Sequence, residues 1–344
     1  MKVVRKIAFF IIGFVFCLSG VFKLADPVGT TFIVSGYFNF LHLWWLDFSS
    51  SFLARLLAFV ETVVGAALLT GFAKKITGIV SAVMLGFFTL LTLLLLIFNP
   101  EMDCGCFGEV VHLTHLQSFL KNVVLDLLWV AAFIPFGDFT VPSKSKMVGF
   151  FVATVSLLGF AIWSSFNIPA LDFTAFAPGE EIILDGDISE NAVLPFCDAD
   201  GIYRDSAAVA GKVLVVSVPY PDRLKDKQWR KIDALLDAAG GRGYSPLLLV
   251  ASAPPQLPDV PSALPAFSAD PRTLLTLNRS NGGAAFVSDG LIVRKWPLRH
   301  LPSEEDLTAL SLEDATASVI SENTPSRLKF QGFLLYVFAV LLLL

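Results

Sequence analysis

The stretch Ile76–Phe98, with the sequence ITGIVSAVMLGFFTLLTLLLLIF, is long, apolar and free of charged side chains. A helix that crosses the hydrocarbon core of a bilayer needs roughly 20 mostly apolar residues, so this stretch predicts a transmembrane helix. The whole chain agrees, because 55% of its 344 residues are hydrophobic and only 16% are charged. A soluble globular domain carries about 25% charged residues. The sequence therefore predicts an integral membrane protein, with the lipid bilayer as a partner.

Further apolar stretches predict more membrane-spanning helices. Four have the required length and a fifth is only marginally long enough: Ile7–Ala25, Leu56–Ala73, Phe119–Phe136, Met147–Ile168 and, marginally, Phe330–Leu344. Lys23, near the end of the first stretch, is expected to extend its ammonium group to the interface. Basic residues precede this first stretch, as in a secretory signal peptide, but the apolar run is long and no small-residue cleavage pattern follows it. We therefore predict that it is retained as a helix.

The segment Val28–Leu46 decides the predicted orientation of these helices. It has no formal charge, and its polar residues and two tryptophans, Trp44 and Trp45, fit either a span or an interfacial position. If it lies flat, all the basic clusters that flank the first five spans share one side: Lys2, Arg5, Lys6, Lys74, Lys75, Lys144 and Lys146. That placement satisfies the positive-inside rule. We therefore expect a multi-pass protein of the inner (cytoplasmic) membrane, with this segment, the loop 99–114 and the domain 170–326 on the extracytoplasmic (periplasmic) side.

The composition changes after Pro169, where charged residues, prolines and turn signals appear. Short apolar runs predict buried strands, and a 3.6-residue period predicts an amphipathic helix. The predicted elements, in chain order, are a strand, a helix, a strand, a helix and the two strands of a hairpin: Lys212–Val218, Arg223–Ala239, Ser245–Val250, Arg272–Asn278, Ala284–Val287 and Leu291–Trp296. A short run at Ala266–Ser268 precedes the second helix. This order, with a further helix after the hairpin, resembles the thioredoxin fold.

The chemistry of that fold is missing from this domain. A thioredoxin places a Cys-x-x-Cys pair where the first strand meets its helix, because a helix N-terminus lowers the pKa of a thiol. Here that junction is Pro219–Asp222, which contains no cysteine, and the proline expected before the hairpin is absent from Asn281–Gly283. Cys197 is the only cysteine of the domain. We interpret the domain as a structural or partner-binding module, since thiol exchange requires a thiolate.

The most specific stretch of the chain is Asp103–Glu109, with the sequence DCGCFGE. Together with Ser19–Leu24 (SGVFKL) and the Asp26-Pro27 pair that follows, it is similar to the DoxX/MauE family. MauE-like members carry a Cys-x-Cys-Phe-Gly loop on a four-helix membrane bundle, and the resemblance covers residues 1–140. It implies a membrane protein associated with disulfide formation or with the maturation of exported proteins. A fused thioredoxin-like domain behind such a bundle also resembles a known bacterial arrangement.

Three interpretations of Cys104 and Cys106 are open at this point. The first is a redox-active pair, because a Cys-x-Cys disulfide closes a small strained ring, Gly105 gives the backbone freedom to close it, and strained, exposed disulfides exchange readily. A Cys106→Ser variant would then trap a partner through Cys104. The second is a metal site, because two thiolates and the two imidazoles of His112 and His115 suit zinc or copper. The third is a static staple of the loop.

Ionisable residues inside the predicted spans form a second candidate site. Glu61 and Asp126 lie near the middle of their helices, and ionisable groups at membrane depth are functional candidates. A polar membrane pocket would be formed by Glu61, Asp126, Lys23 and Arg55. The alternative is that each carboxylate pairs with a nearby cation and only fixes packing. Cys17, inside the first helix, is more typical of a small apolar filler.

The sequence thus favours a mainly α transmembrane bundle joined to an α/β thioredoxin-like soluble domain. The expected divisions are a DoxX/MauE-like bundle at 1–140, a fifth helix at 141–169, the extracytoplasmic domain at 170–326 and a C-terminal transmembrane segment at 327–344. The leading function is thiol–disulfide exchange, or redox-linked maturation of exported proteins, with a thiol redox partner. A non-enzymatic scaffold that binds partner proteins and metal handling at the outer loop are the alternatives. The sequence identifies no cofactor, and its net charge of −5 gives no basic footprint for nucleic acid.

Overall fold

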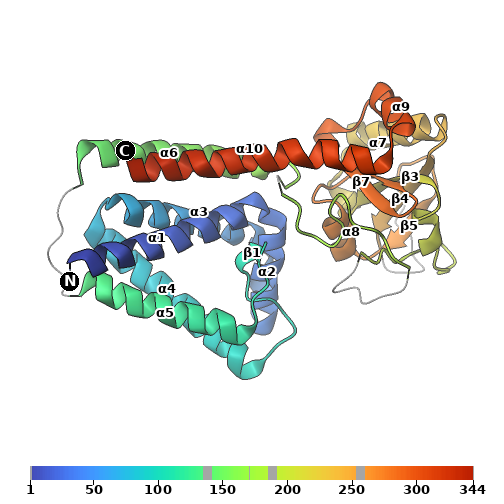
Figure 1. Ribbon diagram of the computed structural model, residues 1–344. Helices are drawn as coiled ribbons and strands as arrows, with labels where there is room; N and C mark the ends of the chain where they lie inside the picture. The colour runs from blue at the N-terminus through green and yellow to red at the C-terminus, as the bar shows by residue number, and fades with distance from the viewer. Residues whose placement is uncertain (1, 135–141, 170, 185–191, 253–259, 344) are drawn as a thin grey trace. The chain divides into compact units, whose positions relative to one another are not determined.

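The computed structural model describes residues 2–134, 142–169, 171–184, 192–252 and 260–343. It divides the chain into two compact units, residues 1–166 with 330–344 and residues 167–329. We call them the membrane unit and the soluble unit. The membrane unit is helical, and the soluble unit is a mixed sheet with helices (Figure 1). The predicted fold class, a helical membrane part with an α/β soluble domain, is confirmed.

Six helices of the described residues are long and apolar enough to cross a membrane. They are α1 (Lys2–Ala25), α3 (Ser50–Thr70), α4 (Lys74–Phe98), α5 (His115–Phe133), α6 (Lys144–Ser164) and α10 (Ala315–Leu343). Each overlaps one of the six stretches predicted from the sequence. Several helices begin earlier than predicted, because polar residues that hydropathy excludes still form helical turns. Thr114 and Gln117, for example, form a capping box that starts α5 ahead of the apolar run.

Helices α1 and α3 lie side by side and approach each other at glycines (Figure 1). A Cβ atom on Gly65 would lie 2.4 Å from the backbone nitrogen of Cys17, and one on Gly20 would lie 2.1 Å from Oγ1 of Thr62. Small residues allow membrane helices to pack this closely, with dispersion contacts along the backbone. The fully buried Cys17 is part of this contact, in the manner of a small apolar filler.

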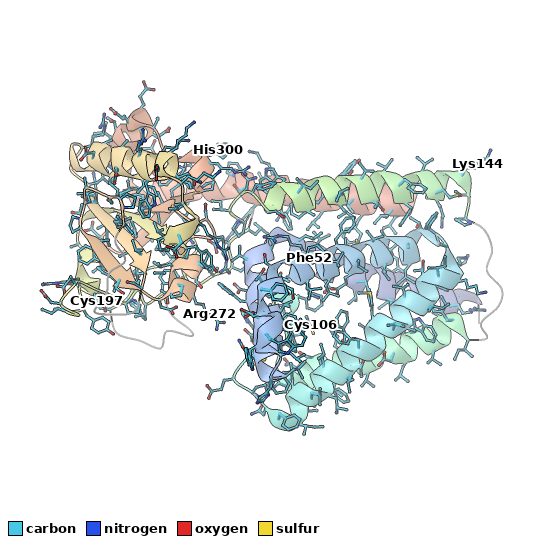
Figure 2. All side chains as sticks on the ribbon, turned by 180° about the vertical axis from the view of Figure 1, so that it is seen from behind. Phe52, Cys106, Lys144, Cys197, Arg272 and His300 are labelled. Carbon is cyan, nitrogen blue, oxygen red and sulfur yellow. The ribbon has the colours of Figure 1, made fainter. Side chains whose placement is uncertain are left out.

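Between α1 and α3 the chain forms a short helix, α2 (Pro27–Phe40), and a 3-10 turn, η1 (Trp44–Ser49). The Asp26 carboxylate caps α2 by accepting a hydrogen bond from the Gly29 amide at 3.0 Å. A helix of 14 residues is about 21 Å long, which is shorter than the hydrocarbon core of about 30 Å. In both views α2 runs across the end of α1 and α3 (Figures 1 and 2). It therefore does not form a seventh span.

The two ends of the membrane unit differ in chemistry. At one end, Arg5, Lys74 and Lys146 lie close enough together for their charges to interact. The other end holds α2 and η1, where large aromatic side chains are exposed, such as Trp44 with 72% of its surface accessible. Exposed tryptophans and basic clusters are typical of the two interfaces of a bilayer. The membrane unit thus has one basic end and one aromatic end.

The soluble unit is built on a six-stranded sheet with the order β2-β5-β4-β3-β6-β7. The strands β2 to β7 are Phe196–Cys197, Lys212–Val218, Ser245–Ala251, Ala266–Ala269, Gly283–Ser288 and Leu291–Trp296. The neighbours β3, β4 and β5 run parallel, and the remaining pairs are antiparallel. The β6–β7 hairpin turns at Asp289 and Gly290, which both have positive φ, as a two-residue type I′ turn requires.

Helices cover both faces of this sheet. They are α7 (Asp226–Gly240), α8 (Pro271–Leu277) and α9 (Glu304–Leu312). Alternate side chains of a strand point to opposite faces, and in β3 Leu214 and Val216 pack with α7 and α9, whereas Val213 and Val215 pack with α8. The observed elements follow the order predicted from the sequence, with two additional strands, β2 at the edge of the sheet and β5, which contains the short run Ala266–Ser268. Because the sheet is buried on both faces, its strands are continuous apolar runs in the sequence, and these runs predicted the strands.

Candidate functional site

The stretch DCGCFGE forms a tight loop that leads into the short strand β1 (Cys106–Glu109), between α4 and α5. Gly105 and Gly108 have φ angles of +63° and +64°, a region that glycine adopts without strain. A Cβ atom on Gly105 would also lie 2.3 Å from Cγ2 of Ile33 on α2. The backbone freedom predicted for Gly105 is therefore used, and the missing side chain lets the loop pack directly on α2.

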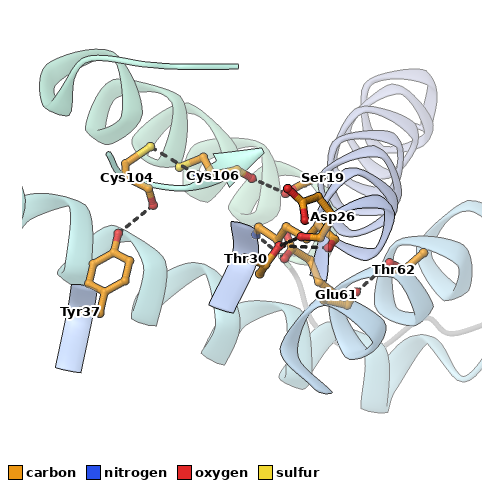
Figure 3. Close-up of polar contacts among 10 residues, drawn as sticks. Ser19, Asp26, Thr30, Tyr37, Glu61, Thr62, Cys104 and Cys106 are labelled. Atoms are coloured by element: carbon orange, nitrogen blue, oxygen red, sulfur yellow. Dashed lines mark hydrogen bonds and ion pairs between the residues drawn. The ribbon is translucent and has the colours of Figure 1, made fainter. Parts of the chain in front are cut away.

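Cys104 is buried and surrounded by hydrogen-bond partners (Figure 3). The Ser118 hydroxyl of α5 donates to its sulfur at 2.8 Å, and the Cys106 backbone amide donates to the same sulfur at 3.4 Å. The Cys104 carbonyl accepts a hydrogen bond from the Tyr37 hydroxyl of α2 at 2.8 Å. Only 5% of Cys104 is exposed, so this sulfur is held from two sides and is poorly accessible.

Cys106 is partly exposed, and its carbonyl accepts a hydrogen bond from the Ser19 hydroxyl of α1. Its sulfur interacts with the Cys104 thiol, and the positive charge of the Lys121 ammonium group acts on it. The Cys104 hydrogen bond and the charges of Lys121 and Lys23 outweigh burial and lower the pKa of Cys106 to about 5. The same hydrogen bond, followed by burial, raises the pKa of Cys104. At neutral pH the pair therefore holds one thiolate, on Cys106, and one thiol, on Cys104.

Lys23 of α1 and Glu61 of α3 form a buried ion pair next to this loop, with Nζ and Oε2 2.6 Å apart. Lys23 is only 7% exposed, so it does not extend to the interface as its position near a helix end allowed, and it pairs with Glu61, as the alternative interpretation of that carboxylate allowed. A carboxylate inside the bundle replaces water as its partner. The Thr30 hydroxyl of α2 donates to the Lys23 carbonyl at 3.0 Å, and the Lys23 charge reaches Cys106. The ion pair thus connects α1, α2 and α3 to the loop Asp103–Glu109, which we call the thiol loop.

The other two ionisable residues of the predicted membrane pocket bind elsewhere. The Asp126 carboxylate accepts a hydrogen bond from the Thr89 hydroxyl of α4 at 2.7 Å. Nη1 of Arg55 donates to the Ser51 hydroxyl, on its own helix, at 2.7 Å. In the part of the chain that the structure describes, neither residue joins the ion pair in α1 and α3. The structure therefore brings together two of the four residues, Lys23 and Glu61.

The two histidines of the predicted metal set do not join the cysteines. Nδ1 of His112 lies 2.9 Å from the Asp103 carboxylate, and Nε2 of His115 lies 2.9 Å from the Met102 carbonyl. Among the described residues, no group of three or more His, Cys, Asp and Glu side chains gathers in a position to hold a metal ion. The spacing in the sequence permitted such a set, but the histidines hydrogen-bond within their own loop.

Four residues that contact the cysteines have no role there in the sequence analysis: Ser19, Tyr37, Ser118 and Lys121. Ser118 and Lys121 are three residues apart and therefore share one face of α5. Because both residues follow the cysteines closely and have this spacing, the sequence could have predicted that they face the loop together. Ser19 and Tyr37 come from two other helices, and no local pattern connects them to the loop.

The soluble unit has no comparable sulfur site among its described residues. Cys197 is buried in the edge strand β2. At the junction between β3 and α7, the Tyr220 amide donates to Oδ1 of Asn281 at 2.9 Å, and Nδ2 of Asn281 donates back to the Tyr220 carbonyl at 2.9 Å. The Arg223 guanidinium lies 4.5 Å from the centroid of the Tyr220 ring. The junction is therefore closed by contacts within the chain.

Comparison with known proteins characterises the first part of the chain. Residues 1–136 match the family described as Methylamine utilisation protein MauE. The match spans α1 to α5 and includes the thiol loop, in agreement with the resemblance noted in the sequence. No curated protein and no solved structure matches the chain. Together with the six apolar helices, the match identifies a multi-pass membrane protein.

Proposed function

We propose that this membrane protein exchanges thiols and disulfides with exported proteins through Cys104 and Cys106. The observation that carries the proposal is the asymmetry of the pair: two free thiols share a hydrogen bond, one buried beside Ser118 and the other partly exposed beside Lys121. A thiolate of low pKa is the nucleophile of thiol–disulfide exchange, and a neighbouring thiol resolves the mixed disulfide. A static staple requires neither feature.

The thiol loop is proposed to face the extracytoplasmic side. Lys144 and Cys106 lie at opposite ends of the membrane unit (Figure 2), and Lys74 and Arg5 belong to the basic end. The positive-inside rule assigns a basic end to the cytoplasm. The thiols would then lie in a compartment where disulfides persist. Helix α6 begins at the basic end, so it would cross outward and residues 167–329 would follow it to the same side.

For the soluble unit we propose a thioredoxin-like domain that binds partners without exchanging thiols itself. The strand order β4-β3-β6-β7 supports this fold, because β3 and β4 are parallel and β6 and β7 form an antiparallel hairpin. Helix α7 connects the parallel strands. Tyr220, bound by Asn281, stands where a redox domain of this topology presents cysteine. Partner binding without thiol exchange is therefore the role that we propose for the soluble unit as a whole.

The family match gives only a general indication of the biological process in which this exchange would take part. The matched family is described by its part in methylamine utilisation. For this chain we propose a more general role, the maturation of exported proteins that carry cysteine pairs. The thiol loop lies within the matched residues, and it is the part of that region with the chemistry for such a role.

Thiol trapping in intact cells tests this function. Cells are treated with a mild reductant or with oxidised glutathione, quenched in acid, and labelled at free thiols with a maleimide for mass spectrometry. We expect Cys104 and Cys106 to lose and regain reactivity together, while Cys17 and Cys197 stay reduced. A membrane-impermeant maleimide should label Cys106 in intact, reduced cells if the loop faces outward.

The control is the double variant Cys104→Ser, Cys106→Ser, which removes both thiols with little change in volume. Two results would contradict the proposal. A pair that stays oxidised under reductant would indicate a static staple. A pair that resists maleimide until a chelator is added would indicate a metal site.

A further inference from the structure

We propose that Cys106 is the sulfur that forms the mixed disulfide with a partner, and that Lys121 is the positioning residue that holds it ready as a thiolate. This assignment rests on the proposed function of the pair and specifies the order of its steps. It is based on a division of roles along α5. Ser118 and Lys121 share one helical face, and they serve different cysteines: Ser118 hydrogen-bonds to the Cys104 sulfur, whereas Lys121 contacts Phe107, next to Cys106, and its charge acts on the Cys106 sulfur.

The ammonium group of Lys121 is placed by a contact with the loop. It lies 5.2 Å from the centroid of the Phe107 ring, in a cation–π arrangement. Phe107 is the residue directly after the proposed nucleophile. The contact therefore keeps the charge of Lys121 near the Cys106 sulfur, on which it acts.

Other titratable groups around the loop do not replace this cation. They are a phenol, a thiol, an ion pair, a hydrogen-bonded aspartate–histidine pair and two carboxylates that meet beside Gly29: Tyr37, Cys104, Lys23 with Glu61, Asp103 with His112, Asp26 and Glu109. The charge of Lys23 also reaches Cys106, but the Glu61 carboxylate at 2.6 Å balances most of it. After the interaction with Cys104, the charge of Lys121 is thus the main cause that lowers the pKa of Cys106.

Accessibility assigns the two sulfurs to different steps. Cys106 is partly exposed, whereas Cys104 is 5% exposed and receives hydrogen bonds from Ser118 and from the Cys106 amide. A partner reaches the accessible thiolate first. This reverses the trapping order expected from the sequence, in which Cys104 holds the partner.

The exchange balances without a further reactant when the partner is a protein disulfide. The Cys106 thiolate attacks one partner sulfur, the partner S–S bond breaks, and the released partner thiolate takes a proton from water. The Cys104 thiol then loses its proton to water, and its sulfur attacks Cys106. The Cys104–Cys106 disulfide forms as the second partner thiolate leaves and is protonated. Two electrons pass from the pair to the partner, and the same intermediates serve the reverse direction.

The test uses the full chain purified in detergent and the neutral disulfide dithiodipyridine, whose reduction is followed by absorbance. The variants Cys104→Ser and Cys106→Ser each leave one loop sulfur. We expect Cys106 in the first variant to react about tenfold faster at neutral pH than Cys104 in the second. The serine that replaces Cys104 keeps a hydroxyl donor near Cys106, so the comparison preserves the local hydrogen bond.

Lys121 is tested in the Cys104→Ser background by the pH profile of the reaction. Lys121→Met should move the midpoint for Cys106 upward by about 1–2 pH units, whereas Lys121→Arg should keep it close to the parent value. Lys75→Met is the matched control, because Lys75 is an exposed lysine at the start of α4 and the variant loses the same charge. If Lys121→Met does not fold, the pH profile of the Cys104→Ser variant still tests the assignment. A midpoint for Cys106 at the pH where an ordinary thiol titrates would overturn it.

The assignment and the proposed function fail in different ways. Equal rates at the two sulfurs, or an unchanged midpoint in Lys121→Met, would overturn the assignment even if the pair cycles in cells. A fast, lysine-dependent Cys106 in a chain whose pair never changes redox state in cells would support the assignment and contradict the function.

Discussion

The thiol loop of the membrane unit and the β3–α7 junction of the soluble unit satisfy their polar atoms differently. In the loop, side chains from α1, α2 and α5 bind the two cysteine carbonyls and the Cys104 sulfur, and Cys106 stays partly exposed. In the junction, Asn281 binds both the amide and the carbonyl of Tyr220. The loop keeps a reactive atom accessible, whereas the junction closes on itself.

The difference concerns two units of unlike architecture. The soluble unit, with strand order β2-β5-β4-β3-β6-β7, has a tyrosine at the junction, and the unit with paired thiols is a helix bundle. The function that we propose is therefore assigned from the geometry of a site and not from the fold of the soluble unit. The predictions below test whether the two regions act independently.

The largest effect is expected from the ion pair beneath the thiol loop. Glu61→Gln removes the carboxylate but leaves the Lys23 ammonium group buried, so the membrane unit should lose about 3–5 kcal/mol of stability. The measurement is detergent-dependent unfolding of the full chain, followed by loss of helical signal. The soluble unit, followed by limited proteolysis, should keep its native resistance in the same variant.

A double variant provides the control for that prediction. Lys23→Met combined with Glu61→Leu removes both charges and should restore much of the stability, because the penalty comes from an unpaired charge in the bundle. The stability losses of Lys23→Met and of Glu61→Leu are also measured separately. If they add up to the loss of the double variant, the two side chains are not coupled, and the ion pair does not support the thiol loop.

Much of the fold follows from patterns that are local in the sequence. Uncharged runs such as Ile76–Phe98 predicted the spans, and continuous apolar runs such as Lys212–Val218 predicted the buried strands, the latter with the same limits as observed. Helix ends were less accurate, because capping depends on polar residues such as Thr114. Glycines that bring α1 and α3 into contact were not recognised, since an approach of two backbones depends on residues far apart in the chain.

The candidate site was predicted only in part. The motif identified Cys104 and Cys106, and the φ angle of Gly105 agrees with its expected role. The partners of the two cysteines come from three helices that are separated by long stretches of sequence, so spacing did not predict the bond from Tyr37 to the Cys104 carbonyl. Lys23 was expected at the interface because a lysine near a helix end usually extends there. Instead, Lys23 binds the Glu61 carboxylate on α3 and stays buried.

A smaller effect is expected from the glycines of the thiol loop. Gly105→Ala combines a positive φ, which costs about 1–2 kcal/mol, with a collision against Ile33. The loop should therefore separate from α2, and alkylation of the buried Cys104 should rise about tenfold by mass spectrometry. Gly108→Ala is the matched control, because it has a similar φ of +64° but its nearest new neighbour is 3.7 Å away. Equal exposure of Cys104 in both variants would contradict the role of the α2 contact.

The smallest effect is expected at the junction of the soluble unit. Asn281→Ala removes two hydrogen bonds to the Tyr220 backbone, but the ring of Tyr220 is 39% exposed and water will replace part of the loss. The soluble unit should therefore lose about 1 kcal/mol. Urea-dependent proteolysis within residues 212–240 of the full chain measures this change. Asn281→Asp keeps the acceptor for the Tyr220 amide and loses the donor, so its loss should be intermediate.

Neither Asn281 variant should alter the chemistry of the thiol loop. The rate at which dithiodipyridine reacts with Cys106 in the Cys104→Ser background should stay within about twofold of the parent rate, a free-energy difference near the usual error of additivity between distant sites. A rate that changes about tenfold would show that the junction and the loop act as one site, because independent regions share no such coupling. The separation of the closed junction from the reactive loop would then be wrong, and the soluble unit would have to be counted among the elements that control Cys106.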